Sequence, residues 1–160
     1  MDLKKIIVVS GYPEVFKIIK ESRRGLIVES LQTGKRMQVF LTQKISTLED
    51  IAIFTEDGDI PLKDVFLKIY EKQNQQKAPD PKNLSPDELK NYFEQVLPEY
   101  NKNKVYISDM KKVLRWYNML FEKGLIQELA NEQNKQEEKN EQDKNSENNN
   151  QTNSENKNQQ

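Results

Sequence analysis

The sequence predicts an α+β protein with a disordered end. Three observations lead to this class. Short β-branched runs separated by turn residues fill residues 1–55, amphipathic helical stripes follow from residue 61, and the last 34 residues are almost devoid of apolar side chains. Five short strands at spacings near ten residues favour a small barrel or bent sheet. We therefore expect an SH3-like barrel or a bent antiparallel sheet of about five strands with one helix, followed by an α-helical hairpin and a disordered tail.

The expected strands are separated by turn sequences that contain glycine or proline. Ser10-Gly11-Tyr12-Pro13, Arg23-Arg24-Gly25 and Thr33-Gly34 are typical of tight turns. Ser46-Thr47-Leu48-Glu49 resembles a capping box and predicts one helical turn. The strands predicted between these signals cover residues 6–9, 15–20, 26–31, 36–41 and 51–55.

Three amphipathic helices follow the predicted strands. The first covers residues 61–72, with an apolar stripe at helical spacing. The second begins after Ser85, which pairs with Glu88 as a capping box, and the third runs from Ser108 to just before Gly124. The last two helices form a hairpin too small for an independent core. We expect it to dock on the first domain, on helix 61–72, or on a second copy of the chain.

The composition divides the chain into four parts. We predict a β-rich domain with a C-terminal helix at 1–72, a polar linker at 73–83, the helical hairpin at 84–126 and a tail at 127–160. Seventeen of the 34 tail residues are Asn or Gln, and the tail holds four lysines against eight acidic residues. Such a segment cannot bury enough apolar surface to offset its ordering entropy. We expect its removal to leave the thermal melt nearly unchanged.

The chain contains no cysteine and no histidine. This excludes disulfides, thiolate or imidazole metal sites, and nucleophilic catalysis by Cys or by a Ser-His pair. The N-terminal apolar run, residues 6–9, is too short for a signal peptide, and no stretch is long enough to span a membrane. We expect a cytoplasmic protein without a cofactor, a membrane contact or an evident small-molecule substrate.

Residues 1–126 resemble an uncharacterised family of small bacterial proteins, known only as a domain of unknown function. The resemblance implies a β-rich N-terminal unit and a helical C-terminal unit, and it implies no activity. It covers nearly the whole ordered part and excludes the tail. It rests on Ser-Gly-Tyr-Pro at 10–13, Gly-Leu-Ile-Val-Glu-Ser-Leu at 25–31, Gly-Lys-Arg at 34–36, Ile-Ser-Thr-Leu-Glu-Asp-Ile-Ala-Ile-Phe-Thr at 45–55, Val-Tyr-Ile-Ser-Asp-Met-Lys-Lys-Val-Leu at 105–114 and Trp-Tyr-Asn at 116–118.

Basic residues suggest a candidate nucleic-acid surface. Two pairs lie at predicted turns that could share one end of the sheet, and three more lie on the outer face of the third helix. Small barrels bind single strands by combining such charges with exposed aromatic rings. Solvated loops explain the same pattern, since turns are exposed. The candidate contacts are Arg23, Arg24, Lys35, Arg36, Lys111, Lys112 and Arg115.

Two aromatic residues are candidate partner contacts. Tyr12 lies in a predicted turn, and loops often carry binding residues. Trp116 adjoins the apolar stripe of its helix, where core packing is the simpler explanation; an exposed Trp would be an interface anchor.

The acidic run at 56–59 lacks the spacing of a calcium loop. No set of residues meets the requirements of an active site.

We therefore expect a non-enzymatic interaction module that binds a protein partner or self-associates. The alternative is a weak RNA- or DNA-binding protein. For the alternative to hold, the basic residues must share one face with an aromatic side chain among them.

Overall fold

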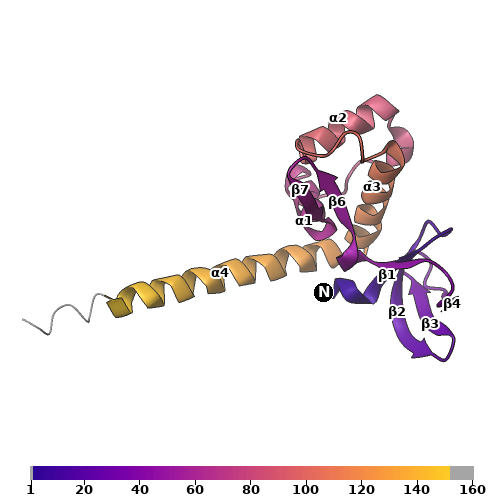
Figure 1. Ribbon diagram of the computed structural model, residues 1–160, viewed down its shortest axis with the longest axis horizontal. Coiled ribbons are helices and arrows are strands. Elements are labelled where there is room, and N and C mark those ends of the chain that lie inside the picture. The colour runs from indigo at the N-terminus through magenta and orange to yellow at the C-terminus, as the bar shows by residue number, and fades with distance from the viewer. Residues whose placement is uncertain (1, 152–160) are drawn as a thin grey trace, which may run out of the picture.

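The computed structural model describes residues 2–151, with side chains to residue 146, and has the expected α+β class (Figure 1). A five-stranded antiparallel sheet has the order β4-β3-β2-β1-β5, and a separate hairpin pairs β6 with β7. Four α-helices follow or flank these sheets. The strands are β1 Ile6–Val9, β2 Val15–Ser22, β3 Gly25–Ser30, β4 Arg36–Phe40, β5 Ile45–Thr47, β6 Ala52–Thr55 and β7 Gly58–Pro61, and the helices are α1 Leu62–Lys72, α2 Pro86–Val96, α3 Ile107–Glu122 and α4 Leu125–Gln151.

The fifth strand of the main sheet is not the one that the sequence predicts. β5 at 45–47 completes the sheet by pairing with β1, whereas the predicted strand at 51–55 becomes β6 of the second sheet. The helical turn η2, Leu48–Asp50, separates them. Thr47 caps it, because its side chain accepts a hydrogen bond from the Asp50 N–H at 3.3 Å. This turn redirects the chain between the two sheets.

The main sheet is bent around a small core of its own. Ile7, Val9, Phe16, Val28 and Val39 cluster on its inner side and are almost fully buried. β4 and β5 occupy the two edges, so the described strands form an open bent sheet rather than a closed barrel. The bent-sheet alternative is therefore the one that describes this fold.

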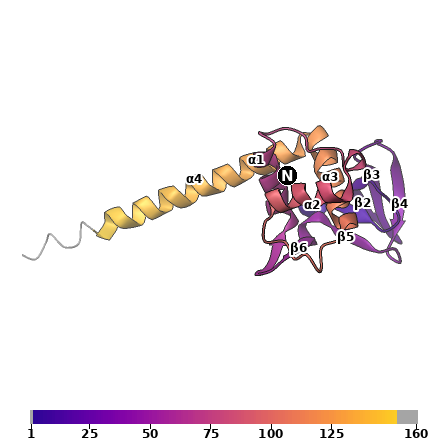
Figure 2. The ribbon, with the colours of Figure 1, turned by 90° about the horizontal axis from the view of Figure 1, so that it is seen from above.

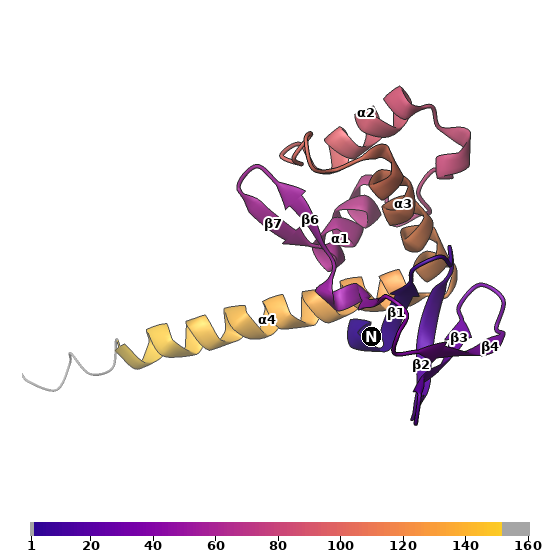
Figure 3. The same cartoon turned by 45° about the vertical axis from the view of Figure 1, so that its right-hand side comes forward.

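The helical unit packs on the other side of the sheet at β1. Ile6 and Val15 point to that side and belong to the larger core, which also holds the inner faces of α1, α2 and α3. The predicted stripe of α1 is confirmed, since Leu62, Val65 and Phe66 are fully buried. This single core joins the sheet to the helices, so the hairpin docks on both the sheet and α1 (Figure 3).

The helix ends follow their capping sequences. Ser85 and Glu88 form the predicted capping box of α2, with the Ser85 N–H donating to the Glu88 carboxylate at 2.9 Å. α3 begins one residue before the predicted start, and Gly124 follows it with φ of +73°, which favours glycine. The chain then turns directly into α4.

α4 differs from the expected tail. Its first turns belong to the core, because Ile126 is fully buried and Leu129 is only 4% exposed. The ordered part therefore extends beyond residue 126, and removal of 127–160 would take Leu129 out of the core and lower the thermal melt, contrary to the expectation for the tail. From residue 131 to 146 every side chain is exposed, and the helix projects away from the body (Figures 1 and 2). Glu, Gln and Lys favour a helix even without packing. The end of the predicted tail, 152–160, lies outside the described residues.

Within residues 2–151, no helix combines the length and the apolar character that crossing a membrane requires.

Candidate functional site

α3 separates two hollows on the surface of the molecule. The smaller one, which we call the Trp116 hollow, has a volume of about 180 Å³. β6, the segment before α3 and the first half of α3 form its walls. Its lining residues are Ile51, Ala52, Ile53, Phe54, Lys104, Val105, Asp109, Lys112, Val113 and Trp116. Most of them are apolar, so the hollow suits an apolar side chain.

Backbone hydrogen bonds fix the walls of the Trp116 hollow. The Asn101 N–H donates to the Phe54 carbonyl at 2.9 Å, and the Glu56 N–H donates to the Glu99 carbonyl at the same distance. At the start of α3, the Asp109 carboxylate accepts a hydrogen bond from the Tyr106 N–H at 2.9 Å. β6 is thereby tied to the segment before α3, and the first turn of α3 is capped, which makes the hollow a preformed feature.

Two lysines flank the apolar floor of this hollow. The Lys104 Nζ lies 5.2 Å from the centroid of the Phe54 ring, a cation–π distance. Lys112 is exposed on α3 and forms no ion pair among the described residues. Phe54 is 46% exposed. The hollow therefore combines partly exposed aromatic rings with a cationic rim.

The larger hollow lies between the main sheet and the helices. This sheet–helix groove has a volume of about 710 Å³ and contains both acidic and basic side chains. Pro13, Leu31 and Gln32 form its sheet side. Its other lining residues are Lys77, Ala78, Asp80, Pro81, Lys82, Arg115, Asn118, Met119, Glu122 and Lys123.

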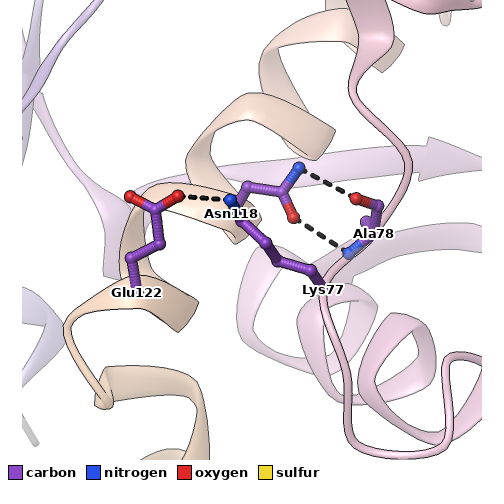
Figure 4. A network of polar contacts seen from close by, with 4 residues as sticks. All are labelled: Lys77, Ala78, Asn118 and Glu122. Carbon is purple, nitrogen blue, oxygen red and sulfur yellow. Dashed lines mark hydrogen bonds and ion pairs between the residues drawn. The ribbon is translucent and has the colours of Figure 1, made fainter.

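One wall of the groove is a clamp that holds the linker on α3 (Figure 4). The Asn118 side chain accepts a hydrogen bond from the Ala78 N–H at 2.9 Å and donates to the Ala78 carbonyl at 3.1 Å. Lys77 pairs with Glu122 beside it. Next to this, the Tyr117 hydroxyl donates to the Gln76 carbonyl at 2.8 Å. Residues 76–78 of the predicted 73–83 linker are thus fixed on α3. In this network the side chains of Tyr117 and Asn118 have a structural role, because both hydrogen-bond to the linker backbone.

Two tyrosines beside the linker, Tyr92 and Tyr117, have raised pKa values. Burial raises the pKa of Tyr92 to about 12, and its hydroxyl donates to the Gln73 side chain at 3.2 Å. The pKa of Tyr117 is also raised, first by burial and then by the nearby Tyr92 and Tyr70. At neutral pH both phenols remain protonated donors, which suits a structural role.

The basic residues at the predicted turns do not share one end of the sheet. Arg23 and Arg24 lie in the β2–β3 turn, whereas Lys35 and Arg36 lie at the β3–β4 turn. The six residues of β3 lie between the two turns, and the five steps from Gly25 to Ser30 cover roughly 17 Å at about 3.4 Å per step. Arg36 is in addition paired with Glu29, with an Nε–Oε2 distance of 3.0 Å. The expectation of a shared end is wrong because consecutive turns of a meander lie at opposite ends.

The three basic residues of α3 also diverge. Arg115 lines the sheet–helix groove and Lys112 lines the Trp116 hollow. Lys111 is partly buried on the same helix. The seven predicted basic residues therefore do not form one continuous surface.

The two aromatic candidates lie beside different hollows. Tyr12 is exposed, packs edge-to-face against Phe16 with 5.9 Å between ring centroids, and precedes Pro13 of the sheet–helix groove. Trp116 is partly buried against the large core and lines the Trp116 hollow. It is thus both a packing residue and part of a surface site. Among residues 2–151, no group of three or more possible ligand side chains gathers as a metal site.

Phe54 and Lys104 are site residues that the sequence interpretation misses. Strand alternation carries the signal for Phe54, because a strand that buries Ile53 must turn its neighbours outward. The sequence carries no comparable signal for Lys104. This residue lies in the loop between α2 and α3, and its side chain extends over the Phe54 ring.

Comparison with known proteins agrees with this two-part structure. Residues 3–48 match the family model Domain of unknown function (DUF5606), and residues 51–120 match Domain of unknown function (DUF6852). The two models meet at η2, where the chain leaves the main sheet. No curated protein matches the chain.

A solved structure is similar to this protein over most of the length of both chains. It is a solution NMR structure of a structural-genomics target from Bacteroides vulgatus, 36% identical, with a TM-score of 0.66. The match covers 78% of this chain and 89% of the other. The chain therefore belongs to the family of two-part proteins in which a Domain of unknown function (DUF5606) is followed by a Domain of unknown function (DUF6852).

Proposed function

We propose that the protein is a non-enzymatic interaction module that binds a segment of a partner protein in the Trp116 hollow. The observation that carries this proposal is the hollow itself, in which Trp116 and the half-exposed Phe54 share an apolar depression. Aromatic residues at the centre of a preformed hollow are typical energetic centres of protein interfaces.

The rim defines the chemistry of the partner segment. Lys104 and Lys112 place positive charge on either side of the apolar floor, and Asp109 is already engaged at the start of α3. A segment with one large apolar side chain flanked by carboxylates matches this arrangement. The apolar side chain supplies most of the affinity, while the charges speed association and select the orientation.

Trp116 provides a direct probe, because it is the only tryptophan of the chain. We would select peptides from a random displayed library on the full-length protein, then titrate the selected peptides while recording Trp116 emission. We expect enriched sequences with an acidic-flanked apolar residue and a blue shift of the emission on binding. Peptides that bind without changing the emission would contradict the proposed site.

A matched pair of variants locates the contact. Phe54→Ser removes an exposed ring from the hollow and should weaken peptide binding about 10-fold or more, as at other interface centres. Leu41→Ser removes an exposed side chain from a distant part of the sheet and should have no effect. Equal weakening by both variants would show that the peptides bind nonspecifically.

Sedimentation distinguishes a different protein from a second copy of the chain. We propose a different protein and expect a constant monomer mass from low to high micromolar concentration. A mass that rises with concentration, and that Phe54→Ser keeps constant, would instead assign the hollow to self-association.

A further inference from the structure

A second surface lies on β2, β3 and β4, away from the Trp116 hollow. Strand alternation defines it, because Val28 and Val39 point into the small core and their neighbours must point outward. We call this surface the outer sheet face. Its residues are Lys17, Lys20 and Ser22 of β2, Gly25, Ile27 and Glu29 of β3, and Arg36, Gln38 and Phe40 of β4.

The register arranges these residues in three cross-strand rows. Phe40 lies opposite Gly25, and Gly25 lies opposite Ser22. The next rows are Gln38, Ile27 and Lys20, then Arg36, Glu29 and Lys17. Rows two residues apart are about 7 Å from one another along the strands. The face is therefore a compact platform with an aromatic end and a basic end.

The Phe40 ring is accessible because its cross-strand neighbour is a glycine. Its side chain is 44% exposed, and Gly25 offers no side chain to cover it. A larger residue could not replace Gly25 without a backbone shift, because a Cβ there would lie 1.9 Å from the Val39 carbonyl oxygen. The close β3–β4 approach thus requires glycine and leaves the aromatic ring accessible.

The charge of the outer sheet face is positive. Lys17, Lys20 and Arg36 are exposed, and Glu29 is the one acidic residue in the three rows. Glu29 is paired with Arg36, whereas Lys17 and Lys20 form no ion pair among the described residues.

The β2–β3 turn adds positive charge beside the aromatic end. Arg23 and Arg24 are exposed there, and the Leu41 N–H donates to the Arg24 carbonyl at 3.2 Å, which fixes the turn next to the end of β4. Neither arginine forms an ion pair among the described residues.

From this arrangement we propose that the outer sheet face binds single-stranded nucleic acid. An unpaired base stacks on Phe40, and Lys17, Lys20 and the arginines of the β2–β3 turn contact phosphates. Gln38 and Ser22, which are hydrogen-bonded to each other at 3.1 Å, lie between these groups and can reach base edges. A duplex is disfavoured because its base faces are stacked and closed to Phe40.

Only part of the basic set predicted from sequence belongs to this surface. Arg23, Arg24 and Arg36 lie on it or at its edge, and Lys17, Lys20 and Phe40 are additional. Lys35 follows Gly34 in the β3–β4 turn, and the basic residues of α3 lie on the helical unit. The face shares no residue with the proposed peptide site.

Salt dependence measures the phosphate contacts. We would titrate the full-length protein into fluorescein-labelled 12-nucleotide oligo(U) and oligo(dT), recording anisotropy from 50 to 200 mM salt. The four proposed phosphate contacts, Lys17, Lys20, Arg23 and Arg24, give a slope of about −2.8 in log affinity against log salt, which is about 50-fold weaker binding across this range. Lys17→Gln should reduce the magnitude of the slope by about 0.7.

Two sets of matched variants test the face itself. Phe40→Ala should weaken binding roughly 5- to 150-fold through lost stacking, whereas Leu41→Ala, at the exposed neighbour outside the rows, should not. The double variant Lys17→Glu with Lys20→Glu should abolish binding at 200 mM salt. The control is the double variant Lys68→Glu with Lys90→Glu, which makes the same charge change on α1 and α2. This control should weaken oligonucleotide binding only slightly.

Three results would overturn the proposal. The first is no anisotropy change at 50 mM salt. The second is equal weakening by the two double variants, which would indicate attraction to net charge alone. The third is unchanged affinity for Phe40→Ala together with equal binding of a duplex. Phe54→Ser should bind the oligonucleotides normally, so failure here remains separate from failure of the peptide site.

Discussion

The main sheet and the helical unit bury apolar side chains on very different scales. The sheet surrounds one small cluster on its inner side and leaves much of its outer face in solvent, while the helices share a core that extends from Leu3 to Leu129. The difference indicates that global stability resides mainly in the helical unit. The ribbon of β2, β3 and β4 depends on backbone pairing and on the small cluster at its inner side, so its outer side chains remain available for binding.

Gly25→Ala should give the largest effect and tests whether backbone pairing controls the ribbon. The added Cβ would meet the Val39 carbonyl oxygen at 1.9 Å, so β4 must move. We expect a loss of about 4 kcal/mol or more in unfolding free energy by urea denaturation. Gly34→Ala is the control, since its φ of +72° strains an alanine but no atom lies within 4 Å of the new Cβ. Its cost should be about 1 kcal/mol; equal costs would show that the close approach is unimportant.

Leu129→Ala tests how far the larger core reaches into α4. The side chain is 4% exposed and packs with the helical unit. Its truncation should lower the unfolding free energy by about 3 kcal/mol. Asn131→Ala, two residues further and exposed, should change it by less than about 0.5 kcal/mol. If both variants melt like the wild type, the ordered part ends before Leu129.

Asn118→Ala tests the clamp between the linker and α3. Both the N–H and the carbonyl of Ala78 would lose their partner in a partly buried place. The expected loss is about 2 kcal/mol in thermal or chemical unfolding. Asn118→Asp keeps an acceptor for the Ala78 N–H and removes the donor to the Ala78 carbonyl. The Ala78 N–H therefore keeps its partner in this variant, and only the Ala78 carbonyl loses one. A wild-type melt for Asn118→Ala would mean that the linker contributes nothing to the helical unit.

Alkaline pH should weaken the helical unit through its tyrosines. The folded pKa of Tyr92 is about 12, above its ordinary value of 10.0, so the folded state holds a proton that the unfolded state releases. This stabilisation is complete below pH 10 and is lost as pH rises from 10 to 12. Denaturation midpoints measured across this window should fall. Tyr92→Phe should make the fall shallower, and an identical profile would contradict the burial of this phenol.

Helix positions were largely predictable because their signals are local. Ser85 with Glu88, Gly124 and the apolar stripe of α1 each act within a few residues, and the structure confirms all three. Strand membership depends on distant partners. A run at 51–55 looks as suitable for the main sheet as one at 45–47, and only pairing with β1 decides between them.

The surfaces were less predictable for the same reason. Charge and aromatic residues can be counted from sequence, yet the register of β2, β3 and β4 determines which of them share a face. Arg23 and Lys35 appear equivalent as turn residues, although β3 separates them. Similarly, the polar composition after residue 126 obscures the fact that Leu129 completes a core.

The most direct test of two separate binding surfaces is Trp116 emission on the full-length protein, recorded with a selected peptide and then with oligo(U). We expect a blue shift with the peptide, no shift with oligo(U), and simultaneous binding of both ligands, each with the affinity it has alone. An emission change caused by oligo(U), or displacement of one ligand by the other, would contradict the assignment of these ligands to different surfaces.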